Sequence, residues 1–479
     1  MKRYFVVFCI LFITISFAQI PDTLWTKTYG GTGWDRGYDV QQTIDGGYVI
    51  VGYTSSFGAG NSDIYLIKTD ANGDTAWTKT YGGTDNDMGY AVRRTNDNGF
   101  VIVGSTYSFG HGSVDVYLIK TDSLGDTVWT QTYGGDSIDH GVSVQQTADS
   151  GYIIVGATQS FGVGGWDVYV VKTNVNGDTL WTKTYGGAYY DYGKAVQQTS
   201  DGGYVIGGSL HNSSDIYLIK TDMQGDTLWT KTYGRNNCYD VLQTPDNGYI
   251  IVGHKYFAGF NSDVLLIKTD SLGDTLWTKA LGSDSTEEIG YSIDHTTDGG
   301  YIITGVTRNI LSPNLDAYLI KTDSLGDMLW TKRLGGTGEE RGVSVQQTID
   351  NGYVVAGWTS SFGAGNEDIY LIKIEPDSLG IEELITTQPK VFFLDIFPNP
   401  FKKKTNIRFQ ISTTGSVKIQ IYDTAGRLIK EFATVAKNLI NQVTWDGTDD
   451  ANRKLPSGVY FLKFQAGDYS GTEKLILLR

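Results

Sequence analysis

Cysteine, proline and charged residues are scarce in this chain of 479 residues. Its two cysteines are Cys9, in an apolar N-terminal run, and Cys238, so a mature chain that keeps only Cys238 forms no internal disulfide. Charged residues make up 19% and the net charge is −15, which disfavours nucleic acid as a partner. Glycine (61) and aromatic residues (13%) are abundant instead, which favours an all-β protein with many tight turns over a disordered chain.

Long apolar runs are confined to the N-terminus. Lys2 and Arg3 precede an apolar run at residues 4–17, and Ala18 and Ser16 place small residues where a signal peptidase cuts. We therefore predict that residues 1–18 are a signal peptide. No later segment reaches membrane-spanning length without charges, so we expect no transmembrane segment in the mature chain.

A repeat of about 50 residues dominates the rest of the sequence. Tryptophan recurs at spacings of 52, 52, 52, 48, 48 and 53 residues, at Trp25, Trp77, Trp129, Trp181, Trp229, Trp277 and Trp330. Each unit holds four β-branched and aromatic segments separated by turn residues, in the first unit at 23–29, 38–43, 48–53 and 63–69. Four short strands per repeat predict the blades of a β-propeller, with almost no helix.

The two ends of the repeat array complement each other. The first unit has a tryptophan strand with no apolar strand before it, and the last unit ends at residues 368–373 without its tryptophan strand. We therefore predict a seven-bladed β-propeller over residues 19–375, in which residues 22–29 complete the seventh blade. Such closure by the N-terminal strand leaves no open sheet edge.

The chain changes character after the repeats. Residues 19–389 carry 22 basic and 45 acidic residues, a net charge of −23, whereas residues 390–479 carry 14 and 8, a net charge of +6. This asymmetry predicts two domains with different tasks. We place a linker at residues 376–390 and a second domain at residues 391–479.

The second domain contains five short motifs in a fixed order. Their characteristic residues are Pro398, Asn399, Pro400, Tyr422, Asp423, Gly426, Trp445, Asp446, Gly447, Gly458, Val459, Tyr460 and Lys474. Together they make this segment resemble the type A C-terminal sorting domain of the type IX (Por) secretion system. The alternative is a generic immunoglobulin-like module.

The resemblance implies a small Ig-like β-sandwich of seven strands. It also implies two partners, the type IX secretion machinery and a sortase-like protease that removes the domain. The expected route is signal-peptide-directed export to the periplasm and then passage across the outer membrane. The product is expected to be secreted or attached to the outer surface of that membrane.

Acidic residues recur just after the Tyr-Gly-Gly turn that follows the tryptophan strand, at Asp35, Asp87, Asp139, Asp191, Glu288 and Glu340. In a propeller this turn lies near the mouth of the central channel. A ring of carboxylates there could hold a hard cation or bind a basic partner. The alternative is that each carboxylate accepts backbone N–H bonds and fixes its own loop.

The predicted innermost strands carry paired glutamines, one of which should face the channel. Three units depart from this pattern, with Arg93-Arg94, Leu242-Gln243 and Asp294-His295. A specific site is expected where the repeat is broken, so Arg93, Asp294 and His295 are candidate binding residues. The Ser-Phe-Gly loops add Phe57, Phe109, Phe161 and Phe362, which could stack on sugars or pack between loops.

No catalytic motif is recognisable: there is no Walker loop, nucleophile elbow, HExxH or CxxC, and we predict no cofactor and no resident metal ion. Three hypotheses for the function remain open. The first is an exported propeller that binds a glycan or a surface protein at its loop-rich face. The second is a polysaccharide-active hydrolase or lyase, and the third a passive component of a surface layer.

Overall fold

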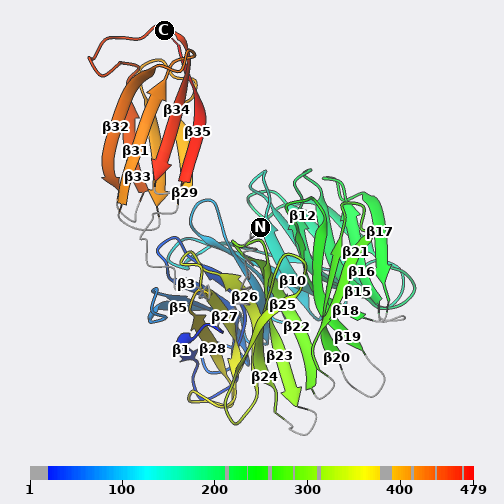
Figure 1. Cartoon of the computed structure of the whole chain (residues 1–479). Helices are drawn as coiled ribbons and strands as arrows, with labels where there is room; N and C mark the ends of the chain where they lie inside the picture. Colours follow the sequence, from blue (N-terminus) through cyan, green and yellow to red (C-terminus); the bar gives the residue numbers. More distant parts are fainter. Residues whose placement is uncertain are drawn as a thin grey trace, which may run out of the picture. The chain divides into compact units, whose positions relative to one another are not determined.

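The computed structural model contains strands and turns, and no helix among the residues it describes. Contacts divide the chain into two units, residues 1–380 and 381–479 (Figure 1). The described residues are 20–210, 215–234, 236–256, 262–283, 286–309, 314–377, 391–411, 415–436, 440–466 and 469–478. The predicted signal peptide and most of the predicted linker lie outside them.

The first unit consists of seven four-stranded antiparallel sheets. From the inner to the outer strand, the first four are β2 (Asp35–Gln42), β3 (Tyr48–Thr54), β4 (Asp63–Thr69) and β5 (Thr75–Tyr81); β6 (Asp87–Arg94), β7 (Phe100–Thr106), β8 (Asp115–Thr121) and β9 (Thr127–Tyr133); β10 (Asp139–Gln146), β11 (Tyr152–Thr158), β12 (Asp167–Thr173) and β13 (Thr179–Tyr185); β14 (Asp191–Gln198), β15 (Tyr204–Leu210), β16 (Asp215–Thr221) and β17 (Thr227–Tyr233).

The remaining three are β18 (Asn236–Gln243), β19 (Tyr249–Tyr256), β20 (Ser262–Thr269) and β21 (Thr275–Leu281); β22 (Thr286–His295), β23 (Tyr301–Asn309), β24 (Asp316–Thr322) and β25 (Met328–Leu334); β26 (Glu340–Gln347), β27 (Tyr353–Thr359), β28 (Asp368–Ile374) and β1 (Thr23–Tyr29). Neighbouring sheets face one another in a closed cycle that returns from β27 to β2. The prediction of a seven-bladed propeller is thus confirmed.

The ring is closed by the strand that comes first in the sequence. β1 pairs antiparallel with β28, with Thr26 opposite Ile372 and Thr28 opposite Tyr370. The seventh blade therefore combines segments from both ends of the repeat array, as predicted. This pairing covers the outer edge of β28, which would otherwise offer its backbone groups to another chain.

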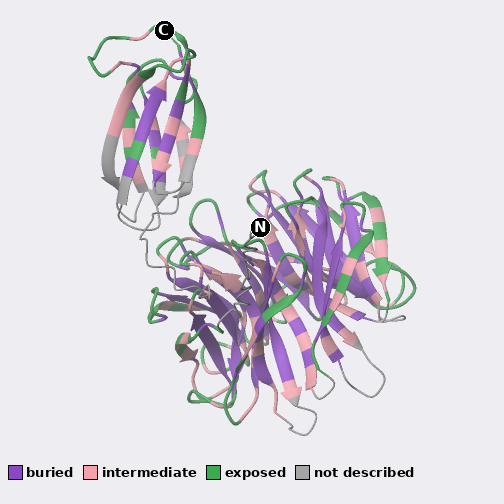
Figure 2. Cartoon of the chain, viewed as in Figure 1, coloured by how far each residue is buried: buried purple, intermediate pink, exposed green. Residues whose placement is uncertain are grey.

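Blade stacking accounts for the apolar middle strands. Every residue of β3 and β4 is buried, because each blade is covered on both faces by its neighbours (Figure 2). The tryptophan of each outer strand packs against an aromatic residue of the next blade, as Trp181 does against Tyr204 with ring centroids 6.0 Å apart. The outer strands themselves are largely exposed.

A buried lysine ends the third strand of every blade. In the second blade Lys120 Nζ donates to the carbonyl of Thr121 and pairs with Asp97, in the turn between β6 and β7, at 2.8 Å. The same pair recurs with Lys68, Lys172, Lys220, Lys268, Lys321 and Lys373. Each pair ties a third strand to the turn that joins the first two strands of its blade.

The innermost strands begin three residues earlier than the sequence predicted. β2 starts at Asp35 rather than at residue 38, and its register with β3 shifts between Gly37 and Asp39. The same β-bulge occurs in all seven innermost strands. It inserts one extra residue and reverses which side chains face the channel.

The second unit is a β-sandwich of seven strands, which confirms the predicted fold of this domain. One sheet contains β29 (Val391–Phe397), β30 (Thr405–Ile411) and β33 (Ile440–Trp445). The other contains β32 (Leu428–Ala436), β31 (Gly415–Tyr422), β34 (Gly458–Ala466) and β35 (Tyr469–Leu477). Trp445 is fully buried between them, with Phe401 and Tyr460 against its ring.

Ring closure can be tested with a pair of proline variants. Thr26→Pro in β1 and Thr182→Pro in β13 alter the same position of an outer strand, but β13 pairs with its own hairpin neighbour. We expect the midpoint of thermal unfolding to fall by roughly 5 °C more in Thr26→Pro than in Thr182→Pro. The pairing of β1 with β28 closes a loop that spans the whole repeat array, so it costs more entropy than the pairing of β13 with the adjacent β12. An unchanged unfolding midpoint in Thr26→Pro, with a decrease in Thr182→Pro, would show that β1 does not close the ring.

Acid should destabilise the propeller through the turn aspartates. Partial burial opposes ionisation of Asp97 and Asp246, but bonds from Lys120 and Lys268, respectively, lower the pKa of each to about 2. Because the pKa is depressed in the folded state, the stabilisation is complete above about pH 4 and is lost as the pH falls towards 2. Unfolding measured between pH 5 and 2 should be less pH-dependent in Asp97→Asn/Asp246→Asn. Asp85→Asn, outside these ion pairs, serves as the control.

Candidate functional site

The two faces of the propeller differ in their connections. The turns between the first and second strands and between the third and fourth strands of each blade lie on one face, the turn face. The connections between blades, and those between second and third strands, lie on the opposite face, the loop face. The bulged ends of the innermost strands surround the channel on the loop face.

The recurring carboxylates are buried rather than arranged around an open ring. The six side chains proposed as a cation or partner site, Asp35, Asp87, Asp139, Asp191, Glu288 and Glu340, are each at most 3% exposed. Asp139 Oδ2 accepts the N–H of Gly135 at 2.8 Å and the hydroxyl of Ser160 at 2.6 Å. These contacts agree with the alternative interpretation, in which each carboxylate fixes the conformation of its own loop. Among the described residues, no group of three or more His, Cys, Asp or Glu side chains is placed to hold a metal ion.

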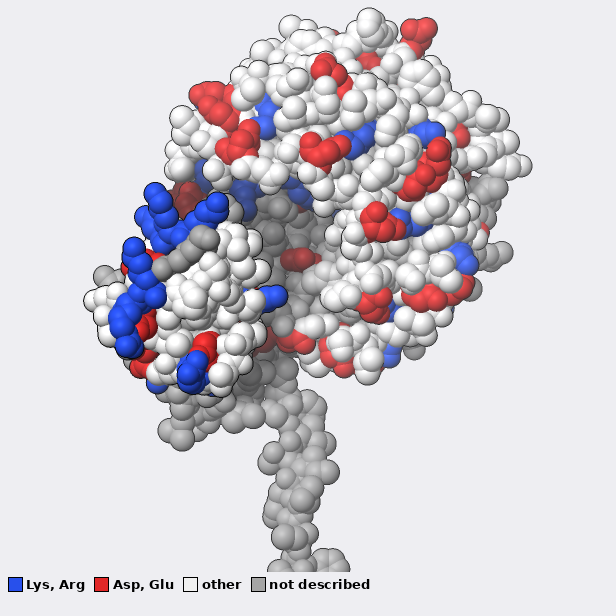
Figure 3. Space-filling view, turned by 90° about the horizontal axis from the view of Figure 1, so that it is seen from above, with Lys and Arg blue, Asp and Glu red and all other residues white. Residues whose placement is uncertain are grey.

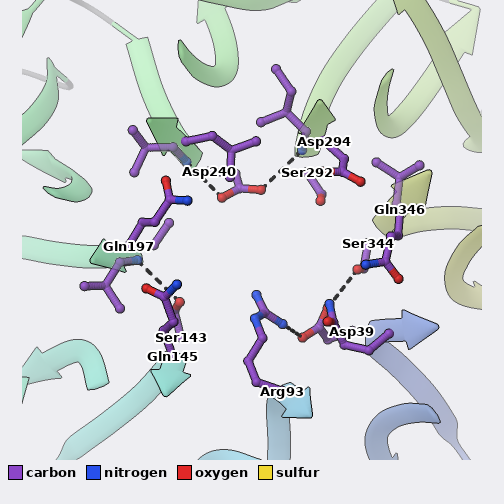
Figure 4. A pocket seen from close by; sticks show the side chains of 17 residues that line it. Asp39, Arg93, Ser143, Gln145, Gln197, Asp240, Ser292, Asp294, Ser344 and Gln346 are labelled. Atoms are coloured by element: carbon purple, nitrogen blue, oxygen red, sulfur yellow. Dashed lines mark hydrogen bonds and ion pairs between the residues drawn. The ribbon is translucent and has the colours of Figure 1, made fainter. Parts of the chain in front are cut away.

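The channel encloses a cavity of about 180 Å³ with a polar lining (Figure 4). The first glutamine of each pair faces it. In three of the four pairs this glutamine accepts a backbone N–H of the next blade, as Gln197 Oε1 does from Gln243 at 2.6 Å. The second glutamine reaches back, as Gln146 Oε1 does to the N–H of Asn96 at 2.9 Å. The paired glutamines thus connect neighbouring blades. They accept backbone N–H groups that form no hydrogen bond within a sheet.

The three candidate residues that break this pattern are also engaged within the protein. Arg93 forms an ion pair with Asp39 of the preceding blade. Asp294 Oδ2 accepts the N–H of Gln347 at 2.9 Å, the contact that a first glutamine makes elsewhere. Arg93 and Asp294 line the cavity, whereas the His295 ring lies against Tyr301 with Nε2 3.1 Å from the carbonyl oxygen of Gln243. The structure therefore does not assemble an acid–base pair from these residues.

The sequence reasoning missed two titratable groups in the cavity, Asp39 and Asp240. Burial raises the pKa of Asp240 to about 7, although its carboxylate accepts backbone N–H bonds from Ile293 and Val241. The equivalent positions hold Asp39 and otherwise small residues, namely Ala91, Ser143, Ala195, Ser292 and Ser344. Only a column-by-column alignment of the seven repeats reveals this position.

The same alignment shows where the blades differ most. The residue after the buried acid or its equivalent is Arg36, Met88, His140, Tyr192, Asn237, Ile289 or Arg341. Two residues further on, at the bulge, stand Tyr38, Tyr90, Val142, Lys194, Tyr239, Tyr291 and Val343. The core position two residues after the bulge is Val in six blades and Ile in the other. These fourteen variable residues form what we call the channel mouth.

Five of the fourteen residues of the channel mouth are tyrosines. Tyr38 and Tyr90, from neighbouring blades, have ring centroids 5.3 Å apart, and those of Tyr239 and Tyr291 are 5.0 Å apart. Elsewhere in the mouth His140 stacks on Trp166 at 5.4 Å. Such pairs present ring faces and edges in a fixed arrangement.

In the part of the propeller that the structure describes, the exposed aromatic residues lie on the loop face. They are Trp34, Phe57, Tyr107, Phe109, Phe161, Tyr189, Tyr190 and Phe362, all in loop-face connections. The large exposed apolar residues in the described turns of the opposite face are aliphatic, for example Leu124 and Leu272, or methionine. Each loop phenylalanine lies against the tyrosine of its own third strand, as Phe109 does against Tyr117 at 5.5 Å. Phe109 nevertheless remains 43% exposed.

The motif residues of the second unit hold its last strand and its turns. Asn399 Nδ2 donates to the carbonyl of Lys474 at 2.6 Å, and its Oδ1 accepts the N–H of Ile476 at 2.9 Å. Asp423 forms a turn with Gly426, whose φ is +76°, and Asp446 accepts the N–H of Thr448. Pro398, Pro400, Gly447, Gly458 and Val459 lie in or beside the same segments, and Tyr422 Oη donates to Gln420. The Lys474 side chain is exposed.

Residues 395–478 match the family model described as a secretion system C-terminal sorting domain. A curated relative, the regulatory protein FlaEY of Caulobacter vibrioides, is 28% identical over 200 residues. That match covers 36% of this chain and 20% of the relative, so the chain spans about a fifth of its length.

Solved structures similar to this chain include two that cover most of its length. A fungal alcohol oxidase of the AA5 family, in complex with copper, has a TM-score of 0.50 at 11% identity and covers 96% of this chain and 100% of its own. PorZ, a surface component of the type IX secretion system of Porphyromonas gingivalis, has a TM-score of 0.42 at 11% identity, with 94% and 60% covered. At this identity the first likeness concerns the fold alone. Within the described residues no helix has the length and hydropathy needed to cross a membrane.

The role of the buried carboxylates can be tested at Asp139. Asp139→Ala removes the acceptor for Gly135 and Ser160, and an unsatisfied buried group costs about 1–3 kcal/mol. We expect the free energy of unfolding in urea to fall by about that amount, with no change in Ca²⁺ titration. An unchanged stability together with a loss of Ca²⁺ binding would support the cation-site interpretation instead.

Proposed function

We propose that this chain, whose residues 395–478 are a secretion system C-terminal sorting domain, is exported by type IX secretion and binds glycans at the loop face of its propeller. The sorting domain directs the chain to secretion or to the outer surface. Release from the cell, or attachment to the outer membrane after removal of the domain, is the finer part of this proposal. The propeller would be the part that remains active outside the cell.

The observation that carries the proposal is the distribution of exposed aromatic side chains. Sugar rings bind by stacking their apolar face on aromatic rings, and partly exposed Phe, Tyr and Trp side chains supply such surfaces. Among the described residues of the propeller they occur on the loop face, whereas the large exposed apolar residues of the turn face are aliphatic or methionine. A protein whose surface had drifted without selection for a ligand would not be expected to segregate the two kinds of residue.

Sequence variation at the channel mouth also supports the loop face as the ligand-binding face. The seven blades retain nearly identical cores, turns and lysine–aspartate pairs, yet two positions at the loop-face end of each innermost strand vary between blades. A merely structural layer would have no need for this diversity. The hydrolase alternative finds no support from Arg93, Asp294 and His295, because each is engaged in contacts between or within blades.

Glycan binding can be measured by affinity electrophoresis or a glycan array with the full chain. We expect Phe57→Ala/Phe109→Ala to weaken binding by about tenfold, since each stacking contact contributes about 0.5–1.5 kcal/mol. The matched control is Leu124→Ala/Leu272→Ala, which truncates side chains that are each 61% exposed on the turn face. Equal losses in the two variants, or no glycan bound by the wild type, would contradict the proposal.

A further inference from the structure

Sixteen lysines and arginines of the propeller form ion pairs with carboxylates. On the face seen in Figure 3 many Lys and Arg side chains of the propeller lie beside Asp or Glu. Seven pairs are the lysine–aspartate pairs of the turns, and five join outer strands to neighbouring turns, as Lys79 does to Asp126. Acidic residues outnumber basic ones about two to one, so a cation without a carboxylate partner needs a separate explanation.

Two cations of the channel mouth lack such a partner among the described residues. Lys194, at the bulge of β14, has its Nζ 5.7 Å from the centroid of the Tyr192 ring and forms no ion pair. Burial lowers the pKa of Lys194, as expected for an ammonium group that has lost water without gaining a carboxylate. Tyr192 itself stacks against Trp166 at 5.7 Å, so an aromatic shelf adjoins the ammonium group.

Arg341 occupies a comparable setting on β26. Its guanidinium lies over the Trp358 ring, 5.1 Å from the centroid, and Nη1 donates to Tyr291 Oη at 3.3 Å. Its Nε is buried without an acceptor. The neighbouring Arg36 also lies over Trp358, but it is neutralised by Glu367 through a bond of 2.9 Å and a second, shorter one. Arg341 therefore retains donors and a charge for a group from outside.

The two cations lie on opposite sides of the channel axis. β14 belongs to the fourth blade and β26 to the seventh, with two blades between them in one direction and three in the other. A ligand seated in the mouth would lie between them, with the tyrosine pairs of the other blades around it. The mouth thus combines ring surfaces for a sugar with unpaired positive charge.

We propose that the channel mouth binds an anionic glycan, rich in uronates or sulfated sugars, whose charged groups pair with Lys194 on one side of the mouth and with Arg341 on the other. This inference rests on the proposed glycan-binding function and names the class of glycan. The net charge of −23 on residues 19–389 does not strongly oppose the binding of an anion. At physiological ionic strength, charges more than about 8 Å away are largely screened. The charges nearest the ligand then determine its electrostatic attraction, and at the mouth these include the two unpaired cations.

The test compares polymers that differ only in charge. The full chain is titrated with polygalacturonate and its carboxyl-reduced form, and with dextran sulfate and dextran. We expect the wild type to bind at least one anionic polymer about tenfold more tightly than its neutral counterpart, the size of one charged hydrogen bond. The two pairs show whether carboxylate or sulfate is the recognised group.

Three variants separate the mouth from general charge effects. Lys194→Met and Arg341→Met should each weaken binding of the anionic polymer about tenfold and leave the neutral polymer within twofold. Arg94→Met is the matched control, since it removes the same charge from an exposed arginine at the turn-face end of an innermost strand. We expect it to change both affinities less than twofold.

The outcomes distinguish this inference from the function on which it rests. Equal wild-type affinity for charged and neutral polymers, with binding still lost in Phe57→Ala/Phe109→Ala, overturns the anionic preference alone. Equal losses in all three charge variants also overturn it, because they indicate non-specific attraction. Failure of the wild type to bind any glycan would overturn both proposals.

Discussion

Burial of both faces of every blade is the constraint on which this architecture depends. A middle strand such as β3 is buried on both faces, so a blade needs a neighbouring blade on each side. In an open row the two end blades would each expose an apolar face, and only a closed ring covers them both. Closure in turn requires that one blade be assembled from the two ends of the array, by β1 and β28. The innermost strands then converge on the axis, where the glutamine pairs provide acceptors for N–H groups that no strand can reach.

Most of the fold follows from the sequence, because it is repeated seven times. The tryptophan spacing, the four strands of each unit and the complementary ends of the array predict the ring and its closure, and ordered motifs predict the terminal sandwich. The site was harder to predict, since the bulge after Gly37 is invisible to an alternation pattern. Asp35 lies in a strand rather than in the expected loop and is buried, and after the bulge it is Asp240 that lines the channel cavity.

Each innermost strand contains both constant and variable positions when the seven blades are compared. Positions that meet a neighbouring blade are nearly invariant, because every blade presents the same surface to the next. Positions at the loop-face end of the channel are released from that requirement and vary more between blades. A rigid scaffold with a variable rim suits recognition, because the side chains that change are not those that hold the ring together.

The repetition has a further consequence for how the chain assembles. β1, β13 and β17 share the sequence TLWTKTY, so the exposed edge of β28 could accept an outer strand of any of these kinds, from its own chain or from a second molecule. Proximity along the chain favours the correct arrangement, because β13 and β17 fold back on their own hairpins much faster than distant segments meet. The first segment to emerge is thus the last to find its place, and crowded nascent chains would exchange that segment before any other.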